Sequence, residues 1–345
     1  MDAALLPDLR YMETGSTSAP FNLAVEELIT EGLGLDDPGI FMLWQNAPSV
    51  IIGRHQNARS EVNLPELEKR GIDLVRRLTG GGAVYHDLGN VNFTFVLPRR
   101  PGEKELGAAE LLAPLIDCFA KLGVTARMEG RNDLSIPGRG KFSGLAGRRL
   151  PGKFLLHGTI LYDVDLGVLE EVLLVDPEKY RSKGVASVRA RVANLNEYLS
   201  IGLPELWAAM RGAYATKTLP LPEGLPDAAK ALAARRYANP AWNVGQSPPG
   251  DITLKRRFPF GSLELRLGTR GNLIRECVIT GDFLTPEKGS DEIPVDALAS
   301  ALTGLPADAP AAWAAAWDDF DLGRVFHAAG PDSGAEVGEW LRTAV

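Results

Sequence analysis

The order of short strand patterns in the first 160 residues most limits the folds open to this chain. Residues 21–33 carry apolar side chains at helical spacing, and residues 104–122 form a longer amphipathic pattern. Between and after them the sequence predicts strands at residues 40–44, 49–53, 73–78, 91–97, 124–128 and 154–162. Residues 92–96 alternate strictly between polar and apolar, which predicts a strand buried on one face. Because strands outnumber helices and do not alternate regularly with them, we expect an α+β domain with a mixed sheet, not a doubly wound one.

The second half of the chain divides at a segment rich in proline and glycine. Helical patterns occupy residues 166–174, 204–214 and 228–237, and the segment Gly245-Gln246-Ser247-Pro248-Pro249-Gly250 then has the composition of a linker. Two strands at 261–268 and 272–280 follow, with helices near 293–302, 308–317 and 335–343. A length of 345 residues also fits two domains. We therefore expect a first domain at residues 1–246 and a small α+β domain at residues 251–345.

Composition and charge exclude several classes of partner. The 37 basic and 44 acidic residues give a net charge of −7, whereas a non-specific nucleic-acid binder is usually basic. The two cysteines, Cys118 and Cys277, are far apart, which argues against a disulfide framework or a cysteine metal site. The sequence has neither a signal peptide pattern at its start nor an apolar run long enough to span a membrane. We expect a cytoplasmic protein without a nucleic-acid or membrane partner.

A glycine-rich segment from Arg76 to Asp87 is the strongest local signal for function. Its sequence is Arg-Arg-Leu-Thr-Gly-Gly-Gly-Ala-Val-Tyr-His-Asp. Three successive glycines after a strand let the backbone turn sharply and approach a ligand closely, and exposed amide groups in such a loop can bind anions. Arg76 and Arg77 add positive charge suited to a phosphate or carboxylate. The alternative is a glycine-rich hairpin with a solvated arginine pair.

Two further segments contain residue types that suit catalysis. Gly138-Arg139-Gly140-Lys141-Phe142-Ser143-Gly144 resembles a phosphate-binding loop but is not one, because Ser135 and Phe142 occupy the positions that require glycine and serine or threonine. Lys141 is either an electrostatic catalyst or an ordinary exposed loop lysine. His157 and Thr159 lie on one face of a predicted strand, where a histidine is commonly a structural hydrogen-bonding residue. No histidine pair has zinc-ligand spacing.

Seven segments occur in a characteristic order along the chain. They are Leu43–Asn46 with Ile52–Asn57, Arg76–Asn90, Arg131–Asp133, Lys141–Gly144, His157–Thr159, Ser182–Arg189, and Trp242–Gly245 with Arg257-Phe258. Taken together, these segments resemble the lipoate–protein ligase A family of the biotin/lipoate ligase superfamily, in its full-length form with a C-terminal accessory domain. The resemblance covers about residues 10–285.

The resemblance implies a catalytic domain related to class II aminoacyl-tRNA synthetases and biotin ligases, and it implies residue roles. Lys141 would be the catalytic residue that contacts both the lipoate carboxylate and the α-phosphate of ATP. Asp133 would help to hold Mg²⁺. The other implied ATP and adenylate contacts are Arg77, Gly82, Ala83, Val84, Tyr85, Asn132 and Asp133. The other implied lipoate contacts are Trp44, Arg77, Gly81, His86, Gly144, His157 and Thr159.

The implied reaction is ATP-dependent formation of lipoyl-AMP, followed by transfer of the lipoyl group to a lysine of a carrier domain. The carriers would be acyltransferase subunits of 2-oxoacid dehydrogenases or the glycine-cleavage H protein. Positive charge is needed where the lipoate carboxylate meets an anionic phosphate. One alternative is an octanoyl or lipoyl transferase that uses a cysteine and no ATP, but neither cysteine lies in the glycine-rich segments. A biotin ligase would carry a Gly-Arg-Gly-Arg-x-Gly-Arg run, which is absent, and a non-catalytic lipoyl-binding module is the remaining alternative.

Overall fold

The computed structural model describes residues 7–100, 106–130, 132–174, 192–214, 217–245, 251–286 and 293–343. The N-terminal part is built on a seven-stranded mixed sheet in the order β1-β2-β6-β10-β9-β8-β7, with β1 parallel to β2 and the other neighbours antiparallel. The strands are β1 (Leu9–Glu13), β2 (Gly39–Trp44), β6 (Asn90–Pro98), β7 (Arg127–Glu129), β8 (Asp133–Ile136), β9 (Gly140–Leu150) and β10 (Lys153–Leu161). This arrangement confirms the mixed-sheet α+β prediction.

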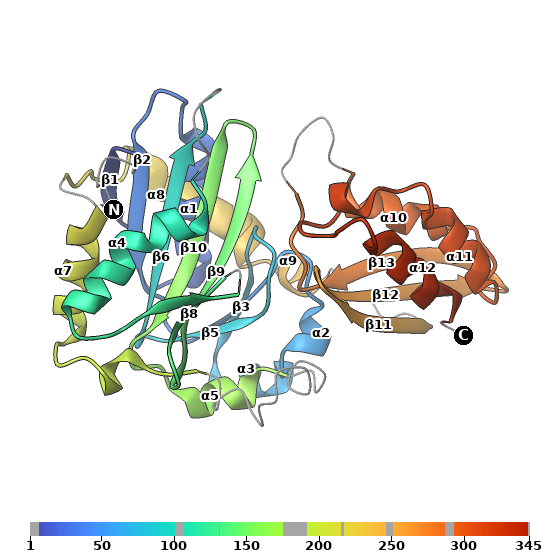
Figure 1. The fold of residues 1–345 in the computed structure, drawn as a ribbon, viewed down its shortest axis with the longest axis horizontal. Coiled ribbons are helices and arrows are strands. Elements are labelled where there is room, and N and C mark those ends of the chain that lie inside the picture. Colours follow the sequence, from blue (N-terminus) through green and yellow to red (C-terminus); the bar gives the residue numbers. More distant parts are fainter. Residues whose placement is uncertain are drawn as a thin grey trace.

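Helices cover both faces of this sheet (Figure 1). One face packs against α4 (Ala108–Lys121) and α7 (Leu203–Tyr214) through a cluster that includes Phe41, Phe93 and Phe95. The other face packs against α1 (Ala19–Gly32), α8 (Leu225–Leu232) and the π-helical turn η4 (Ala233–Tyr237). Successive side chains of a strand point to opposite faces, so neighbouring residues of β2 enter different clusters. The sheet is thus the central layer of three.

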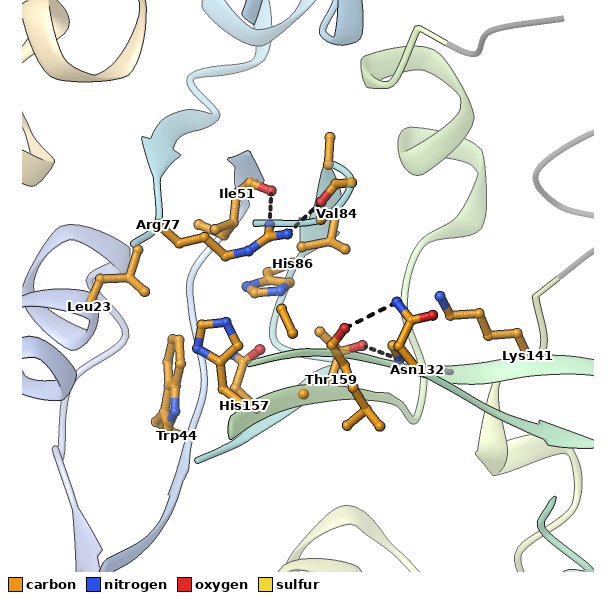
Figure 2. A pocket seen from close by; sticks show the side chains of 18 residues that line it. Leu23, Trp44, Ile51, Arg77, Val84, His86, Asn132, Lys141, His157 and Thr159 are labelled. Carbon is orange, nitrogen blue, oxygen red and sulfur yellow. Dashed lines mark hydrogen bonds between the residues drawn. The ribbon is translucent and has the colours of Figure 1, made fainter. Parts of the chain in front are cut away.

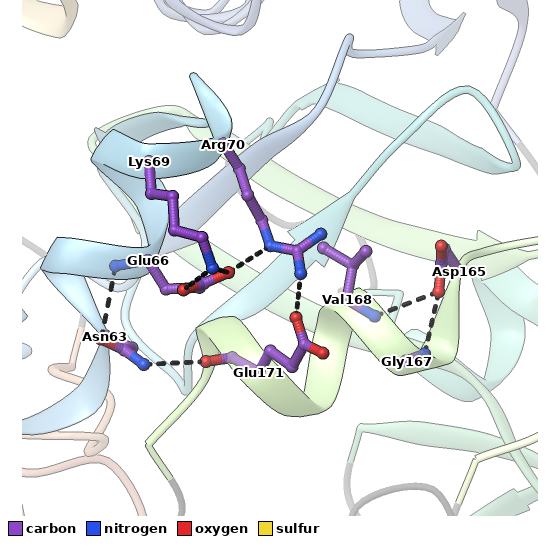
Figure 3. Close-up of polar contacts among 8 residues, drawn as sticks. All are labelled: Asn63, Glu66, Lys69, Arg70, Asp165, Gly167, Val168 and Glu171. Carbon is purple, nitrogen blue, oxygen red and sulfur yellow. Dashed lines mark hydrogen bonds and ion pairs between the residues drawn. The ribbon is translucent and has the colours of Figure 1, made fainter.

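A small second sheet lies beside the large one and carries the glycine-rich segment. Its order is β4-β3-β5, with β3 parallel to β4 and antiparallel to β5. The strands are β3 (Ser49–Ile52), β4 (Asp73–Arg76) and β5 (Val84–His86), and the helices packed nearby are α2 (Ala58–Glu61), α3 (Leu64–Arg70) and α5 (Leu166–Val172). Asn63 and Asp165 cap the N-termini of α3 and α5 (Figure 3). Arg70 pairs with Glu66 within α3 and with Glu171 of α5. These exposed ion pairs add little stability, so the buried cluster beneath them positions β5.

The C-terminal part has its own sheet and its own hydrophobic core. The meander β11 (Ile252–Phe258), β12 (Gly261–Arg270) and β13 (Leu273–Gly281) packs against α10 (Val295–Leu302), α11 (Pro310–Trp317) and α12 (Ser333–Arg342). The remaining short helices are η3 (Leu195–Glu197), α9 (Pro240–Asn243) and η5 (Leu322–Arg324). The core on this sheet contains only residues from position 252 onward among those the structure describes. In the described ranges, no helix is long and apolar enough to cross a membrane.

Three sequence predictions about the elements are wrong or incomplete. The strand at 91–97 is buried on both faces, because its polar residues Asn92 and Thr94 face α1 instead of solvent. The glycine-rich composition of residues 138–144 predicts a loop, but from Gly140 onward they belong to the long strand β9 (Gly140–Leu150), whose register with β10 is set by neighbours distant in sequence. Strands β1, β5, β8 and β11 were also missed. The segment Ser182–Arg189, Arg131 and linker residues 246–250 lie outside the described residues.

Candidate active site

A cavity of about 130 Å³ lies between the large sheet, helix α1 and the glycine-rich segment. Apolar side chains such as Leu23, Trp44 and Ile51 form one side of it, and Lys141 and Asn132 lie at the other (Figure 2). The cavity brings together most of the residues that the sequence singled out. Those lining residues are Trp44, Arg77, Gly81, Gly82, Ala83, Val84, His86, Asn132, Lys141, Gly144, His157 and Thr159.

The glycine-rich loop is held in place by close backbone contacts and by one arginine. Gly81 has a φ of 91°, which disfavours any side chain there. A Cβ on Gly53, at the end of β3, would lie 2.1 Å from the carbonyl oxygen of Gly81, so the loop rests directly on that strand end. The Nη2 atom of Arg77 donates to the carbonyl oxygens of Gly80 (2.6 Å) and Gly82 (2.9 Å). The loop conformation therefore depends on glycine at two positions and on the Arg77 guanidinium.

Arg77 is almost fully enclosed by protein acceptors. Its Nη1 donates to the Ile51 carbonyl oxygen at 3.1 Å, and its Nε donates to Thr79 Oγ1 at 3.0 Å. Burial lowers the pKa of the guanidinium to about 10, while the charge of Glu26 opposes that shift. Arg77 is therefore charged at neutral pH. Its guanidinium hydrogen-bonds to carbonyl oxygens of the loop, and these bonds stabilise the loop conformation.

A chain of buried polar groups extends from Arg77 to helix α1. The Oγ1 of Thr79 is 2.7 Å from His157 Nε2, and His157 Nδ1 is 2.9 Å from a carboxylate oxygen of Glu26. Glu26 also accepts a hydrogen bond from Thr94, whose hydroxyl accepts one from the indole of Trp44. A buried carboxylate requires such partners, since an unpaired charge in an apolar interior is very costly. This network fixes the orientation of the His157 and Trp44 rings that line the cavity.

His86 is also held by a buried partner. Its Nδ1 lies 3.0 Å from Asn46 Nδ2, and Asn46 in turn accepts a hydrogen bond from Asn22. Burial lowers the pKa of His86 to about 3, and the nearby charge of Arg77 adds to the effect. The ring is therefore neutral across the physiological range and adds no charge to the cavity.

Lys141 provides the positive charge at the mouth of the cavity. It stands at the start of β9, opposite Ser135 of β8, and its Nζ is 2.6 Å from the carboxylate of Asp133. The Asn132 amide donates to the Leu145 carbonyl oxygen at 3.2 Å, which fixes that side chain beside the lysine. The strand pairing of β8 with β9 thus aligns Asp133 and Lys141, although eight positions separate them in the sequence.

A second and larger cavity, of about 740 Å³, begins where the first one ends. Gly81, Gly82, Asn132, Lys141 and Ala146 line both cavities. Among the described residues, the wall of the second cavity also includes Asp133 and Glu129 from the N-terminal part. The C-terminal part contributes Arg257, Pro259, Phe260, Gly261, Asp282, Leu284 and His327 to the same wall. Lys141 therefore lies at the junction of a small, largely apolar cavity and a larger one shared by two parts of the chain.

Two residues singled out by the sequence lie elsewhere. The Tyr85 ring packs in the cluster beneath β3 and lines neither cavity, because it points away from its neighbours Val84 and His86 on β5. Arg76 is fully buried and donates to the carbonyl oxygens of Gly53, Trp242 and Asn243. It ties the glycine-rich segment to α9, and its charge is not presented to a cavity of the site.

The sequence reasoning missed Glu26, Thr79 and Thr94. One signal could have revealed Glu26, since it lies three residues after Leu23 and three before Ile29, on the buried stripe of α1. A charged residue in such a stripe needs a partner inside the protein. Thr79 and Thr94 carry no comparable signal, because their role depends on which distant side chain they contact.

Comparisons with known proteins agree along most of the chain. The model for the lipoyl protein ligase A/B catalytic domain matches residues 18–215, and that for the bacterial lipoate protein ligase C-terminus matches residues 247–341. Lipoate-protein ligase LplJ of Bacillus subtilis is 36% identical over 271 residues, which cover 76% of this chain and 81% of that protein.

Solved structures show the same relationship. The crystal structure of P. falciparum LipL1 in complex with lipoate has a TM-score of 0.74 at 22% identity, covering 97% of this chain and 99% of that one, which shows a shared fold. A bi-partite lipoate protein ligase from Thermoplasma acidophilum, studied with its E2 lipoyl domain, has a TM-score of 0.61 at 32% identity and covers 71% and 99%. Lipoate-protein ligase A bound with ATP has a TM-score of 0.59 at 29% identity and covers 69% and 98%.

Proposed function

The chain belongs to the lipoate–protein ligase family, and from this premise we propose that it uses ATP to convert lipoate into lipoyl-AMP and transfers the lipoyl group to a lysine of a carrier domain. The observation that carries the proposal is the position of Lys141 where the two cavities meet. The apolar side of the smaller cavity suits a hydrocarbon tail. The larger cavity suits a nucleotide, and the lysine lies where a carboxylate would meet a phosphate.

In the first step, a lipoate carboxylate oxygen attacks the α-phosphorus of ATP and pyrophosphate leaves. Both reactants are anions, so Lys141 offsets their repulsion and stabilises the charge that develops on the α-phosphate oxygens. The amide groups of Gly81, Gly82 and Ala83 donate to no other described residue and remain available for phosphate oxygens. Arg77 contributes indirectly. Its guanidinium donates to the loop carbonyl oxygens of Gly80 and Gly82, and these hydrogen bonds orient the loop amides.

The charges around the larger cavity fit a nucleotide that brings Mg²⁺. Among the described lining residues, the carboxylates are those of Glu129, Asp133 and Asp282, and the lysine and arginine side chains are Lys141 and Arg257. This wall has more acidic than basic side chains, so a free triphosphate would be repelled by it. Mg²⁺ commonly binds through one or two carboxylates together with phosphate oxygens, and Asp133 is the carboxylate best placed to hold it. When bound, the ion would neutralise part of the phosphate charge.

In the second step, the ε-amine of an acceptor lysine attacks the acyl carbon of lipoyl-AMP, loses a proton and displaces AMP. The amine must therefore reach the junction of the two cavities near Lys141. Lipoyl domains of 2-oxoacid dehydrogenase acyltransferase subunits and the glycine-cleavage H protein are the proposed acceptors. The relative from T. acidophilum, studied with its E2 lipoyl domain, supports this class.

The direct test is to incubate the protein with ATP, Mg²⁺, lipoate and an apo lipoyl domain. We expect lipoate-dependent release of pyrophosphate and a carrier mass increased by one lipoyl group, as measured by mass spectrometry. A carrier with its acceptor lysine replaced by arginine should stay unmodified while lipoyl-AMP still accumulates. If neither pyrophosphate nor modified carrier forms, the ligase proposal fails.

The main alternative, a transferase that carries the acyl group on a cysteine, has no suitable thiol. Cys118 is buried in α4 and Cys277 lies on β13, and neither lines the two joined cavities. Burial raises the pKa of Cys118 and raises that of Cys277 to about 12, so both stay protonated and weakly nucleophilic.

We therefore predict that replacing both cysteines by alanine leaves ligase activity within about twofold of the wild-type rate, since adenylate chemistry needs no thioester. Pyrophosphate release and carrier modification are measured side by side, with circular dichroism as the folding control. A folded double variant that cannot modify the carrier would favour the transferase. Retention of binding without any turnover in the wild-type protein would favour a non-catalytic module.

A further inference from the structure

The hairpin that joins β11 to β12 places an arginine of the C-terminal part in the wall of the larger cavity. Arg257 is the penultimate residue of β11, and Pro259, Phe260 and Gly261 at the turn line the same cavity. Among the described residues of this wall, Lys141 and Arg257 are the lysine and arginine side chains. Each belongs to a different part of the chain.

The hairpin is packed by stacked aromatic rings and approaches the glycine-rich loop through Phe283. The rings of Phe258 and Phe260 are stacked with centroids 5.2 Å apart, and Phe260 stacks on Phe326 at 4.7 Å. Phe283 connects the two structures. A Cβ on Gly80 would lie 2.5 Å from the Phe283 carbonyl oxygen, and a Cβ on Gly261 would lie 2.8 Å from its Cα. Phe283 therefore lies between Gly80 of the loop and the turn of the hairpin that carries Arg257.

One nitrogen of the Arg257 guanidinium is held by protein acceptors, and the other two can donate to a ligand. Its Nη1 donates to Ser262 Oγ at 3.0 Å and to the Asp282 carboxylate at 3.2 Å, and Asp282 is itself held by the Ser262 amide. Within the described parts of the chain, its Nε and Nη2 atoms have no hydrogen-bond partner. The side chain is 38% exposed, so these donors can reach a ligand in the cavity. Planar guanidinium donors suit phosphate oxygens well.

The charge of the leaving group explains why a second cation is needed. Pyrophosphate departs with more negative charge than any other group in the reaction, and the proposed function places Lys141 at the α-phosphate. We propose that Arg257 is a pyrophosphate-binding residue that the C-terminal domain contributes to the adenylation site. This inference rests on the proposed ligase function. Because pyrophosphate has left before acyl transfer begins, Arg257 acts in the first half-reaction only.

The test compares Arg257→Ala with Arg256→Ala, which removes the neighbouring arginine on the opposite face of the same strand and outside the cavity. For Arg257→Ala we expect kcat/KM for ATP in lipoyl-AMP formation to fall about 10–100-fold. Transfer from supplied lipoyl-AMP should stay within about twofold of wild type. A calorimetric titration with inorganic pyrophosphate should give a dissociation constant raised by about tenfold or more. Arg256→Ala should match wild type in all three measurements.

Arg257→Lys and Arg257→Gln separate charge from hydrogen bonding. The lysine variant should recover part of the pyrophosphate affinity, and the glutamine variant should recover little. Thermal unfolding of each variant checks that the hairpin is intact. The inference is overturned if folded Arg257→Ala forms lipoyl-AMP and binds pyrophosphate as Arg256→Ala does, or if transfer falls as much as adenylation. If the wild-type protein releases no pyrophosphate with lipoate, the proposed function itself has failed, which is a separate result.

Discussion

At the scale of single residues, the site depends on which side chains keep their charge. Lys141 is partly exposed and paired with Asp133, whereas Arg77 is enclosed and committed to loop carbonyls. The two cations therefore act differently. In the proposed reaction the lysine contacts the reacting groups, whereas the arginine maintains the shape of the loop.

We predict that Lys141→Ala lowers the rate of lipoyl-AMP formation by about 10²–10³, because one preorganised charge is lost at the transition state. Stability should change little, since this partly exposed ion pair is screened by solvent. Single-turnover adenylation and urea unfolding measure the two effects. Lys153→Ala serves as control, because Lys153 lies at the far start of β10 and lines neither cavity. Adenylation within about twofold of wild type would exclude Lys141 from catalysis.

The neutral state of His86 predicts how stability varies with pH. In the unfolded chain its pKa is about 6.5, and burial lowers it to about 3 in the folded protein. Below pH 6.5 the unfolded state therefore binds more protons, so stability is lost as the pH falls from 7 to 5. The expected contribution of His86 is roughly 1–2 kcal/mol over that interval. Urea unfolding at pH 7, 6 and 5 should show a steeper decline for wild type than for His86→Gln. Parallel declines would mean that His86 is protonated in the folded state.

At the scale of elements, the glycine-rich loop depends on the strand end beneath it. Gly53→Ala places a Cβ 2.1 Å from the Gly81 carbonyl oxygen, so the loop must move away from its hydrogen bonds to Arg77. We expect a loss of about 1–3 kcal/mol in the free energy of unfolding. Adenylation should fall about tenfold or more, because the loop amides lose their aim. Gly212→Ala in α7, where a Cβ meets nothing within 4 Å, is the matched control. Normal lipoyl-AMP formation by Gly53→Ala would show that the loop tolerates displacement.

At the scale of the whole molecule, the two parts of the chain meet beside the site while keeping separate cores. The Gly281 amide donates to the His55 carbonyl oxygen at 2.8 Å, and the rings of His55 and Phe283 stack at 5.0 Å. Glu264 accepts a hydrogen bond from Asn57 at 3.0 Å. These contacts place the C-terminal part against the loop at Gly80 and complete the larger cavity.

We therefore predict that a chain ending at Gln246 transfers the lipoyl group from supplied lipoyl-AMP but forms little lipoyl-AMP from ATP and lipoate. Truncation removes Arg257 and the Phe283 contact with Gly80, while the cores of the first part remain. Residues 251–345 added as a separate chain should restore part of the first step. Adenylation by the folded truncated chain at the full-length rate would rule out a role for the C-terminal part. Loss of both steps in a folded truncated chain would mean that the C-terminal part contributes to acceptor binding or to the site itself.

Elements whose pattern is local could be predicted from the amino-acid sequence alone. Periodicity located α1, β2, β3, β6 and β10 to within two residues, because the spacing of apolar side chains reflects the backbone conformation directly. The ordered motifs likewise identified the family, because segments such as the triple glycine and those with Lys141 and His157 occur in the expected order. The local pattern failed for residues 140–144, where glycine-rich composition suggested a loop. Pairing with β8 and β10 makes that segment a strand.

The different contacts of two adjacent arginines could be seen only in the folded protein. One hydrogen-bonds to the glycine-rich loop and the other to α9. Arg76 and Arg77 are chemically identical in sequence, but one faces α9 and the other faces the cavity. The same holds for three buried polar residues. Glu26 hydrogen-bonds to His157, Thr94 accepts a hydrogen bond from Trp44, and Asn92 lines the cavity. Their partners lie many residues away in the chain. Contacts of that kind arise from strand order and packing, which no local spacing of residues records.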